Sequence, residues 1–96
     1  MNGINNKTEK MKEFKDLEFK AKDIVVPGQM AKLEFDNGYG VSVITGYGAY
    51  GSTVAPYELA VLKDGDLCYD TEITSDVIGY LTSDKVTEYM KLIQEL

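Results

Sequence analysis

The sequence from residue 30 to residue 45 reads MAKLEFDNGYGVSVIT, and this stretch decides the fold. Apolar and polar residues alternate on both sides of its centre, which is the pattern of strands that bury one face. The central Asn37 and Gly38 tolerate the positive φ angles that a tight hairpin turn requires. The stretch therefore predicts a β-hairpin. In its second strand, one face would hold Val41, Val43 and Thr45, and the other Ser42 and Ile44.

Further strands are expected on both sides of the hairpin. Before it, apolar residues alternate with charged ones, which predicts a core-facing strand within residues 14–26. After it, residues 57–62 are apolar on both faces, which favours a central strand covered on each side. A turn at residues 63–66 then leads to a partner strand over residues 67–73. The inward side chains of the first and last of these strands would be Leu17, Phe19 and Ala21, and Leu67, Tyr69, Thr71 and Ile73.

Two helices are expected near the C-terminal end of the sequence. Thr74 or Ser75 would cap a short helix that ends at Leu81, and Thr82 or Ser83 would cap a longer helix over residues 84–96. Apolar residues recur in the longer helix at steps of three and four, so one face should pack on the sheet. That face would hold Val86, Tyr89, Met90, Ile93 and Leu96.

Together these elements predict the α+β class: an antiparallel meander of four or five strands with the C-terminal helices packed on one face. The polar composition of residues 1–12 predicts a flexible N-terminal tail. Residues 13–96 are expected to form a single domain, because the chain shows no linker and no repeated unit.

The composition excludes several classes of function. The 96 residues include no histidine and no arginine, so the commonest general base and the bidentate phosphate ligand are both missing. Residues 23–96 carry four lysines and twelve acids, a net charge of 4 − 12 = −8, which disfavours nucleic acid. No apolar run approaches the roughly 18–20 residues that span a bilayer. We therefore expect a cytoplasmic protein that is no enzyme, needs no cofactor or metal, and contacts neither nucleic acid nor membrane.

The loop after the hairpin is the candidate binding site. Residues 46–51 read GYGAYG, which matches the spacing of a nucleotide-binding glycine loop. A dinucleotide fold would need a helix after these glycines, but Pro56 and another strand follow. Three interpretations stay open: a nucleotide or small-ligand loop, a plain connection between strands, and a loop that presents tyrosines to a protein partner. The candidate residues are Gly46, Tyr47, Gly48, Tyr50, Gly51, Ser52 and Glu58.

A second group of polar residues follows the next turn but predicts no site. The acids at 64, 66, 70 and 72 lack the spacing of a calcium loop, so they are interpreted as a solvated strand face. The single cysteine, Cys68, has no histidine to activate it and fits a reducing compartment.

The order of segments in residues 30–96 resembles that of small bacteriophage and prophage proteins with a glycine-rich loop in mid-chain and a terminal helix. The resemblance rests on FDNGYGVSVI at 35–44, the loop at 46–51, YELAVL at 57–62, and most of all DVIGYL within 68–81. It transfers no functional residue.

What the resemblance implies is a phage accessory protein that acts in the bacterial cytoplasm. Small acidic phage proteins often bind and block host machinery, including defence systems, so a host protein is the expected partner. Two alternatives stay open: a small-ligand or nucleotide-binding module that uses the glycine loop, and a structural component that forms oligomers. A homodimer paired through an exposed sheet edge would be one such oligomer.

Overall fold

The computed structural model describes residues 11–21, 27–46 and 48–96. Most of the expected N-terminal tail, residues 1–10, lies outside the described residues, as do residues 22–26 and the candidate Tyr47. The elements in chain order are η1 (Phe14–Asp16), β1 (Lys20–Ala21), β2 (Gln29–Glu34), β3 (Tyr39–Thr45), β4 (Tyr57–Lys63), β5 (Asp66–Leu67), β6 (Ile78–Leu81) and α2 (Ser83–Gln94).

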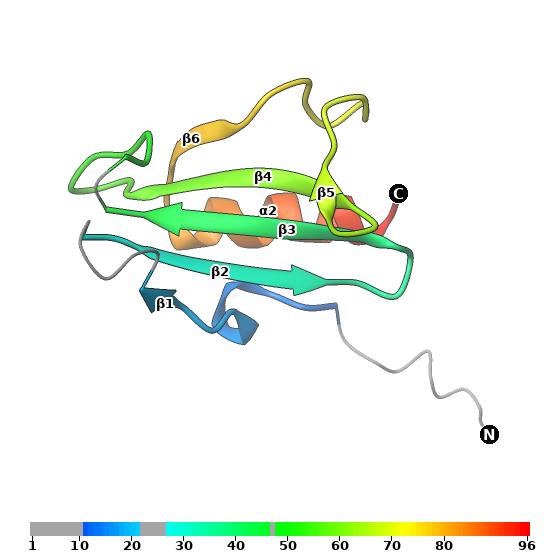
Figure 1. Ribbon diagram of the computed structural model, residues 1–96, viewed down its shortest axis with the longest axis horizontal. Coiled ribbons are helices and arrows are strands. Elements are labelled where there is room, and N and C mark those ends of the chain that lie inside the picture. The colour runs from blue at the N-terminus through cyan, green and yellow to red at the C-terminus, as the bar shows by residue number, and fades with distance from the viewer. Residues whose placement is uncertain (1–10, 22–26, 47) are drawn as a thin grey trace.

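The strands form one open antiparallel sheet with the C-terminal helix on one face. Their order is β1-β2-β3-β4-β5, and β6 pairs with β4 on the same edge as β5. Figure 1 shows α2 running behind the sheet, along β3 and β4. The α+β class, the antiparallel sheet and the one-sided helical cover are thus confirmed. The described residues contain six strands and a single α-helix, because one segment expected to be helical is a strand.

The predicted hairpin is confirmed in position and register. Ala31 lies opposite Val43 and Leu33 opposite Val41, so the apolar residues of β2 and β3 share one face. The turn closes where the Phe35 amide donates to the Tyr39 carbonyl at 2.7 Å, and Gly38 takes the positive φ of +87° expected for it. The alternation of apolar residues and the turn residues favour the same pairing, which is why the sequence determines the register of this hairpin.

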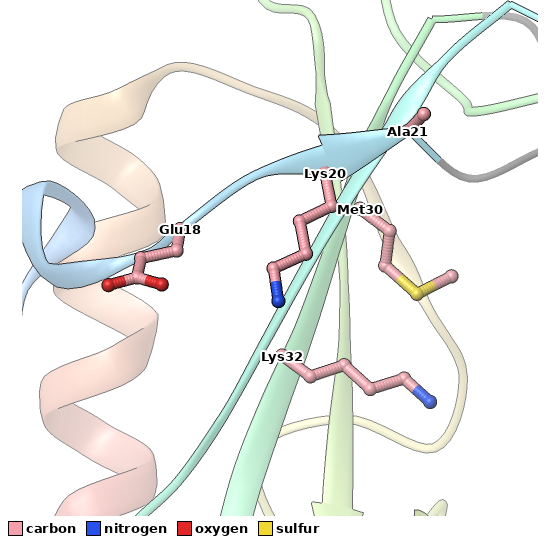
Figure 2. A pocket seen from close by; sticks show the side chains of 5 residues that line it. All are labelled: Glu18, Lys20, Ala21, Met30 and Lys32. Carbon is pink, nitrogen blue, oxygen red and sulfur yellow. The ribbon is translucent and has the colours of Figure 1, made fainter.

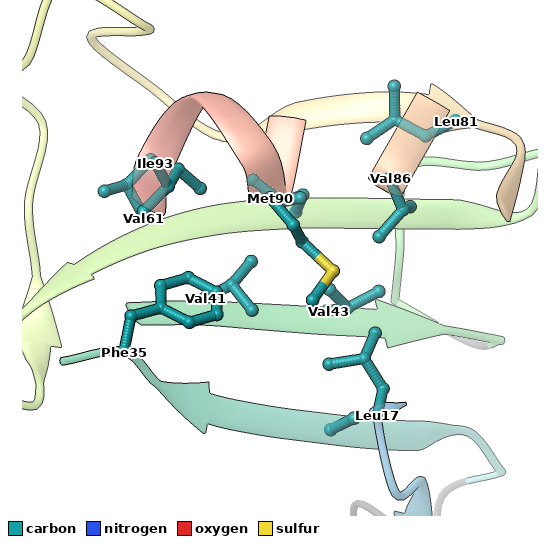
Figure 3. Close-up of a cluster of buried hydrophobic side chains, with 11 residues drawn as sticks. Leu17, Phe35, Val41, Val43, Val61, Leu81, Val86, Met90 and Ile93 are labelled. Atoms are coloured by element: carbon teal, nitrogen blue, oxygen red, sulfur yellow. The ribbon is translucent and has the colours of Figure 1, made fainter. Parts of the chain in front are cut away.

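The core lies between α2 and the helix-facing side of the sheet. Val86, Met90 and Ile93 of α2 are fully buried, as the helical spacing predicts. The helix begins where Thr82 accepts a hydrogen bond from the Lys85 amide at 3.2 Å, which confirms one of the two expected caps. Figure 3 shows the methionine side chain directed into the sheet. The helical residues pack there with Leu17, Ala31, Phe35, Val41, Val43, Leu59, Val61 and Leu81.

The central position expected for β4 is confirmed, but among the described residues a helix covers only one of its two faces. Ala60 and Leu62 of β4 point to this face, yet they are only 7% and 4% exposed. Their neighbours within the sheet shield them, because Leu62 lies between Gly40 of β3 and Leu67 of β5. An apolar strand therefore did not require a second layer of helices.

The expected strand over residues 67–73 is also wrong, because β5 ends at Leu67. Leu67 and Tyr69 are exposed instead of inward, although Ile73 does pack against the core. The cause is a local turn: the Thr71 hydroxyl accepts from the amides of Ile73 and Thr74, at 3.2 and 3.4 Å. A threonine that bonds its own backbone in this way takes those amides out of a strand ladder.

The short helix expected before Leu81 is replaced by β6. The Thr74 hydroxyl accepts from the Asp76 amide and donates to the Asp76 carbonyl, so it forms a turn and caps no helix. Ile78 then lies opposite Leu59, and Leu81 opposite Tyr57. Burial of Leu81 against β4 decides the outcome, because tertiary packing overrides weak helix propensity.

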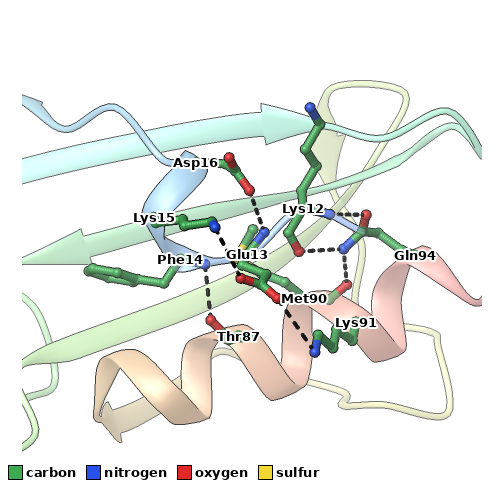
Figure 4. Close-up of polar contacts among 9 residues, drawn as sticks. All are labelled: Lys12, Glu13, Phe14, Lys15, Asp16, Thr87, Met90, Lys91 and Gln94. Carbon is green, nitrogen blue, oxygen red and sulfur yellow. Dashed lines mark hydrogen bonds and ion pairs between the residues drawn. The ribbon is translucent and has the colours of Figure 1, made fainter. Parts of the chain in front are cut away.

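Residues 11–21 lie partly against α2, and only the two residues of β1 among them form a strand. Their backbone is tied to the helix: the Phe14 amide donates to Thr87 at 3.0 Å, and Lys12 exchanges two hydrogen bonds with Gln94 (Figure 4). Leu17 and Phe19 pack on the core as expected, whereas Ala21 is exposed. The core-facing strand predicted within residues 14–26 is therefore confirmed only in part.

Asn37 of the hairpin turn also holds the C-terminal end of α2. Its side-chain amide donates to the carbonyls of Ile93 and Gln94, at 2.9 and 3.2 Å. Its side-chain oxygen accepts from the Tyr39 amide at 3.0 Å within the turn. One residue therefore closes the hairpin and donates to carbonyls of the last helical turn, which lie beyond the regular hydrogen-bond ladder of the helix.

Met90→Ala should lower the free energy of unfolding by about 2–5 kcal/mol, because it leaves a cavity at the centre of the core. Leu92→Ala on the same helix removes a half-exposed side chain and should cost less than about 1 kcal/mol. Urea denaturation of both variants measures the two values. Equal losses would contradict the one-sided core.

Asn37→Asp should cost about 1–2 kcal/mol of unfolding free energy, because a carboxylate cannot donate to the helix carbonyls and repels the negative end of the helix. It keeps the oxygen that accepts from Tyr39, so the turn itself is preserved. The matched control is Asp36→Asn at the adjacent exposed turn position. Thermal and urea unfolding that leave the Asn37 variant as stable as the control would show that this cap contributes nothing.

Candidate functional site

The glycine loop joins β3 to β4 at one end of the sheet (Figure 1). Gly46 and Gly48 have φ angles of +97° and +89°, which favour glycine over any other residue. Gly46 is also crowded: a side chain there would place its Cβ 2.7 Å from the Cα of Gly28. These two glycines are therefore explained by the path of the backbone.

Tyr50 and Glu58, two of the predicted site residues, lie together. The Tyr50 amide donates to a Glu58 carboxylate oxygen at 2.8 Å. The Tyr50 carbonyl accepts from the Tyr80 amide, also at 2.8 Å, so the loop is attached to the outer side of β6. Gly79 permits this approach, because a Cβ there would lie 2.6 Å from the Cβ of Tyr50.

Gly51 and Ser52, by contrast, form a closed turn within the loop. The Ser52 amide donates to the Ala55 carbonyl at 2.9 Å, and its hydroxyl accepts from the Ala55 amide at 3.2 Å. A Cβ on Gly51 would lie 2.7 Å from the carbonyl oxygen of Pro56. Both residues shape the loop, and the amide and hydroxyl of Ser52 already have partners within it.

A β-bulge brings a further residue to this place, one that sequence reasoning missed. Leu81 lies opposite Tyr57 and Ile78 opposite Leu59, so Gly79 and Tyr80 together oppose Glu58. Tyr80 has a φ of +57°, in the left-handed region that a bulky side chain rarely adopts. No local signal in the sequence marks it, because the conformation arises from the pairing of β6 with β4.

The outcome is an exposed aromatic surface, which we call the tyrosine surface and define as Tyr50, Glu58 and Tyr80. The two tyrosines are 61% and 63% exposed. Val54, in the same loop, is exposed as well. Two large amphipathic side chains are thus exposed to solvent, and the backbone that carries them is held by the Tyr50–Glu58 and Tyr80–Tyr50 hydrogen bonds.

Among the described residues of the loop, three backbone amides are not free to bind a phosphate. Ala49, Tyr50 and Ser52 already donate to acceptors within the chain. The acceptor of Tyr50 is a carboxylate, which would repel a phosphate. The nucleotide interpretation stays a prediction, and this geometry gives it no support.

The other polar candidates do not assemble a site. The Cys68 thiol is partly buried and donates to a carboxylate oxygen of Asp70 at 3.0 Å. Within the described part of the chain, no three histidine, cysteine or acidic residues come close enough to hold a metal ion. Nor do the described residues show a base bonded to Ser52, whose hydrogen bonds lie within its own turn.

A pocket of about 310 Å³ lies beside β1 and β2 (Figure 2). Lys20 and Lys32 flank Met30 there, and neither lysine takes part in an ion pair with a described residue. Glu18 also lines the pocket, so the charges on its walls are mixed. The pocket therefore selects no particular charge on a ligand.

Comparison of the chain with protein-family models, curated proteins and solved structures found no match. The resemblance to bacteriophage proteins therefore stays a prediction. Among the described residues, no helix has the length and apolar character needed to cross a membrane.

Tyr80→Gly should be more stable than Tyr80→Ala by about 1 kcal/mol, because glycine adopts the left-handed conformation without steric cost. At a position with ordinary φ the order reverses, since glycine loses more conformational freedom on folding. The same pair of changes at the exposed Tyr69 provides that control. Urea denaturation of the four variants measures the contrast, and an alanine variant at least as stable as the glycine one at residue 80 would show no strain there.

Proposed function

We propose that this protein is a non-enzymatic binding protein, and that it recognises a partner protein through the tyrosine surface. The observation that carries the proposal is Tyr80, an aromatic residue that is 63% exposed and is kept in a left-handed backbone conformation. Such strain persists only where the surrounding structure imposes it, and it concentrates at functional sites. A glycine at this position would fold with less strain but would offer no side chain.

The composition of the surface suits protein recognition. Tyrosine is enriched at binding hot spots, because it combines a large apolar ring with a polar tip and few rotatable bonds. Tyr50 adds a second such ring, and Glu58 supplies a negative charge beside both. With a net charge of −8 over residues 23–96, the chain should favour a partner whose contact surface is basic.

A phage or prophage origin remains part of the proposal, on the resemblance alone. In that setting the partner would be a protein of the bacterial host, and binding would block its action. The absence of histidine from the sequence supports the non-enzymatic character, because proton transfer would have to rely on carboxylates or lysines. Assembly of the chain into homo-oligomers stays a separate prediction, which light scattering would test.

The proposal predicts which variants lose a captured partner. Immobilised protein is exposed to lysate of a bacterial host, and the proteins retained are compared for wild type, Tyr50→Ala/Tyr80→Ala and the exposed-site control Tyr69→Ala. The double variant should weaken capture by at least about tenfold, because each lost anchor at a hot spot costs upward of about 2 kcal/mol. Tyr69→Ala should behave as wild type.

Circular dichroism first establishes that all three proteins are folded. If the folded double variant retains the same proteins as wild type, the tyrosine surface is not the binding site. A thermal-shift screen with millimolar nucleotides provides the competing outcome, because a stabilised wild type would favour the ligand-binding alternative.

A further inference from the structure

The C-terminal half of α2 borders an apolar groove of about 390 Å³, which lies against the segment between β5 and β6. Leu92 and Leu96 of the groove are 48% and 38% exposed, so its apolar walls reach solvent. Ile73 and Tyr89 are partly buried and connect the groove to the core. The complete lining is Glu72, Ile73, Tyr89, Leu92, Glu95 and Leu96.

The charged residues that line the groove are all acidic. Glu72 and Glu95 are its only charged residues, and in the described part of the chain neither side chain makes an ion pair or a hydrogen bond. The C-terminal end of α2 adds its own partial negative charge at this place. An apolar groove lined by two carboxylates therefore favours a ligand that is apolar at its centre and cationic around it.

The walls of the groove are already in position. The turn at Thr71 fixes the backbone before Ile73, and the Asn37 side chain holds the last turn of α2 at the Ile93 carbonyl. A groove whose walls are fixed before binding loses little conformational entropy when it is filled.

We propose that this groove binds a segment of a partner protein that carries one large apolar side chain between lysine or arginine residues. The apolar side chain lies against Leu92 and Leu96, and the cationic ones approach Glu72 and Glu95. The groove is a separate site from the tyrosine surface, because the two lie near opposite ends of α2. A helix of twelve residues separates Tyr80 from Leu96, a length of about 18 Å.

The test uses three acetylated and amidated pentapeptides as probes. The first has a central leucine with two lysines on each side, the second replaces the leucine by glycine, and the third replaces the lysines by glutamates. Each is titrated into ¹⁵N-labelled protein at low salt, and amide chemical shifts are followed. The lysine–leucine peptide should shift the amides of Ile73, Leu92 and Leu96 and bind about tenfold more tightly than the glycine peptide. The glutamate peptide should produce no shift there.

Substitutions of exposed residues separate the apolar contact of the peptide from its contact with the two carboxylates. Leu92→Ser should abolish the preference for leucine over glycine, whereas Leu67→Ser, at an exposed leucine outside the groove, should leave it unchanged. Glu72→Gln/Glu95→Gln should weaken the lysine–leucine peptide about tenfold, and Glu34→Gln should not.

Several results would overturn the proposal. One is equal binding of the lysine peptides with leucine and glycine, which would mean non-specific attraction to an acidic protein. Another is a set of shifts centred away from the groove, and a third is no shift at millimolar peptide. None of these outcomes depends on Tyr50 or Tyr80, so they leave the proposed function to its own test.

Discussion

The packing of one helix on one face of the sheet is the constraint on which the rest of the structure depends. Val86, Met90 and Ile93 are fully buried there, each contributing roughly 1.5–3 kcal/mol of apolar burial. The described chain has no second helical layer, so this contact cannot be replaced. Other parts secure the same helix: the hairpin turn caps its end through Asn37, and the N-terminal segment donates a partly buried hydrogen bond to Thr87.

The packing of β6 on the core explains how the molecule holds Tyr80 in an unfavourable conformation. Ile78 and Leu81 are both packed against the core, so the residues between them must follow a path that these two anchors dictate. The strain at Tyr80 is offset by apolar burial on either side, as expected for a backbone that its surroundings over-determine.

The sequence predicted the elements in which local pattern and tertiary packing agree. The hairpin has period-two alternation and a turn that favours positive φ, and α2 has a helical stripe behind a threonine cap. Residues 67–81 were mispredicted because their local signals conflict. Thr71 and Thr74 resemble strand and cap residues, yet both bond their own neighbours in turns. Whether residues 78–81 form a helix or a strand is decided by the vacant edge of β4, which no local pattern reveals.

The candidate site was also predictable only where a local pattern marks it. Composition drew attention to the glycine loop, and Tyr50 and Glu58 do meet there, but Tyr80 joins them only through a bulge between distant segments. The structure also changes what the loop can offer. Its amides at Ala49, Tyr50 and Ser52 are already bonded, so binding of the proposed partner at these residues would use their side chains. Side chains on a fixed backbone make rigid anchors, and rigid aromatic anchors beside a carboxylate favour the surface of a basic protein over a phosphate.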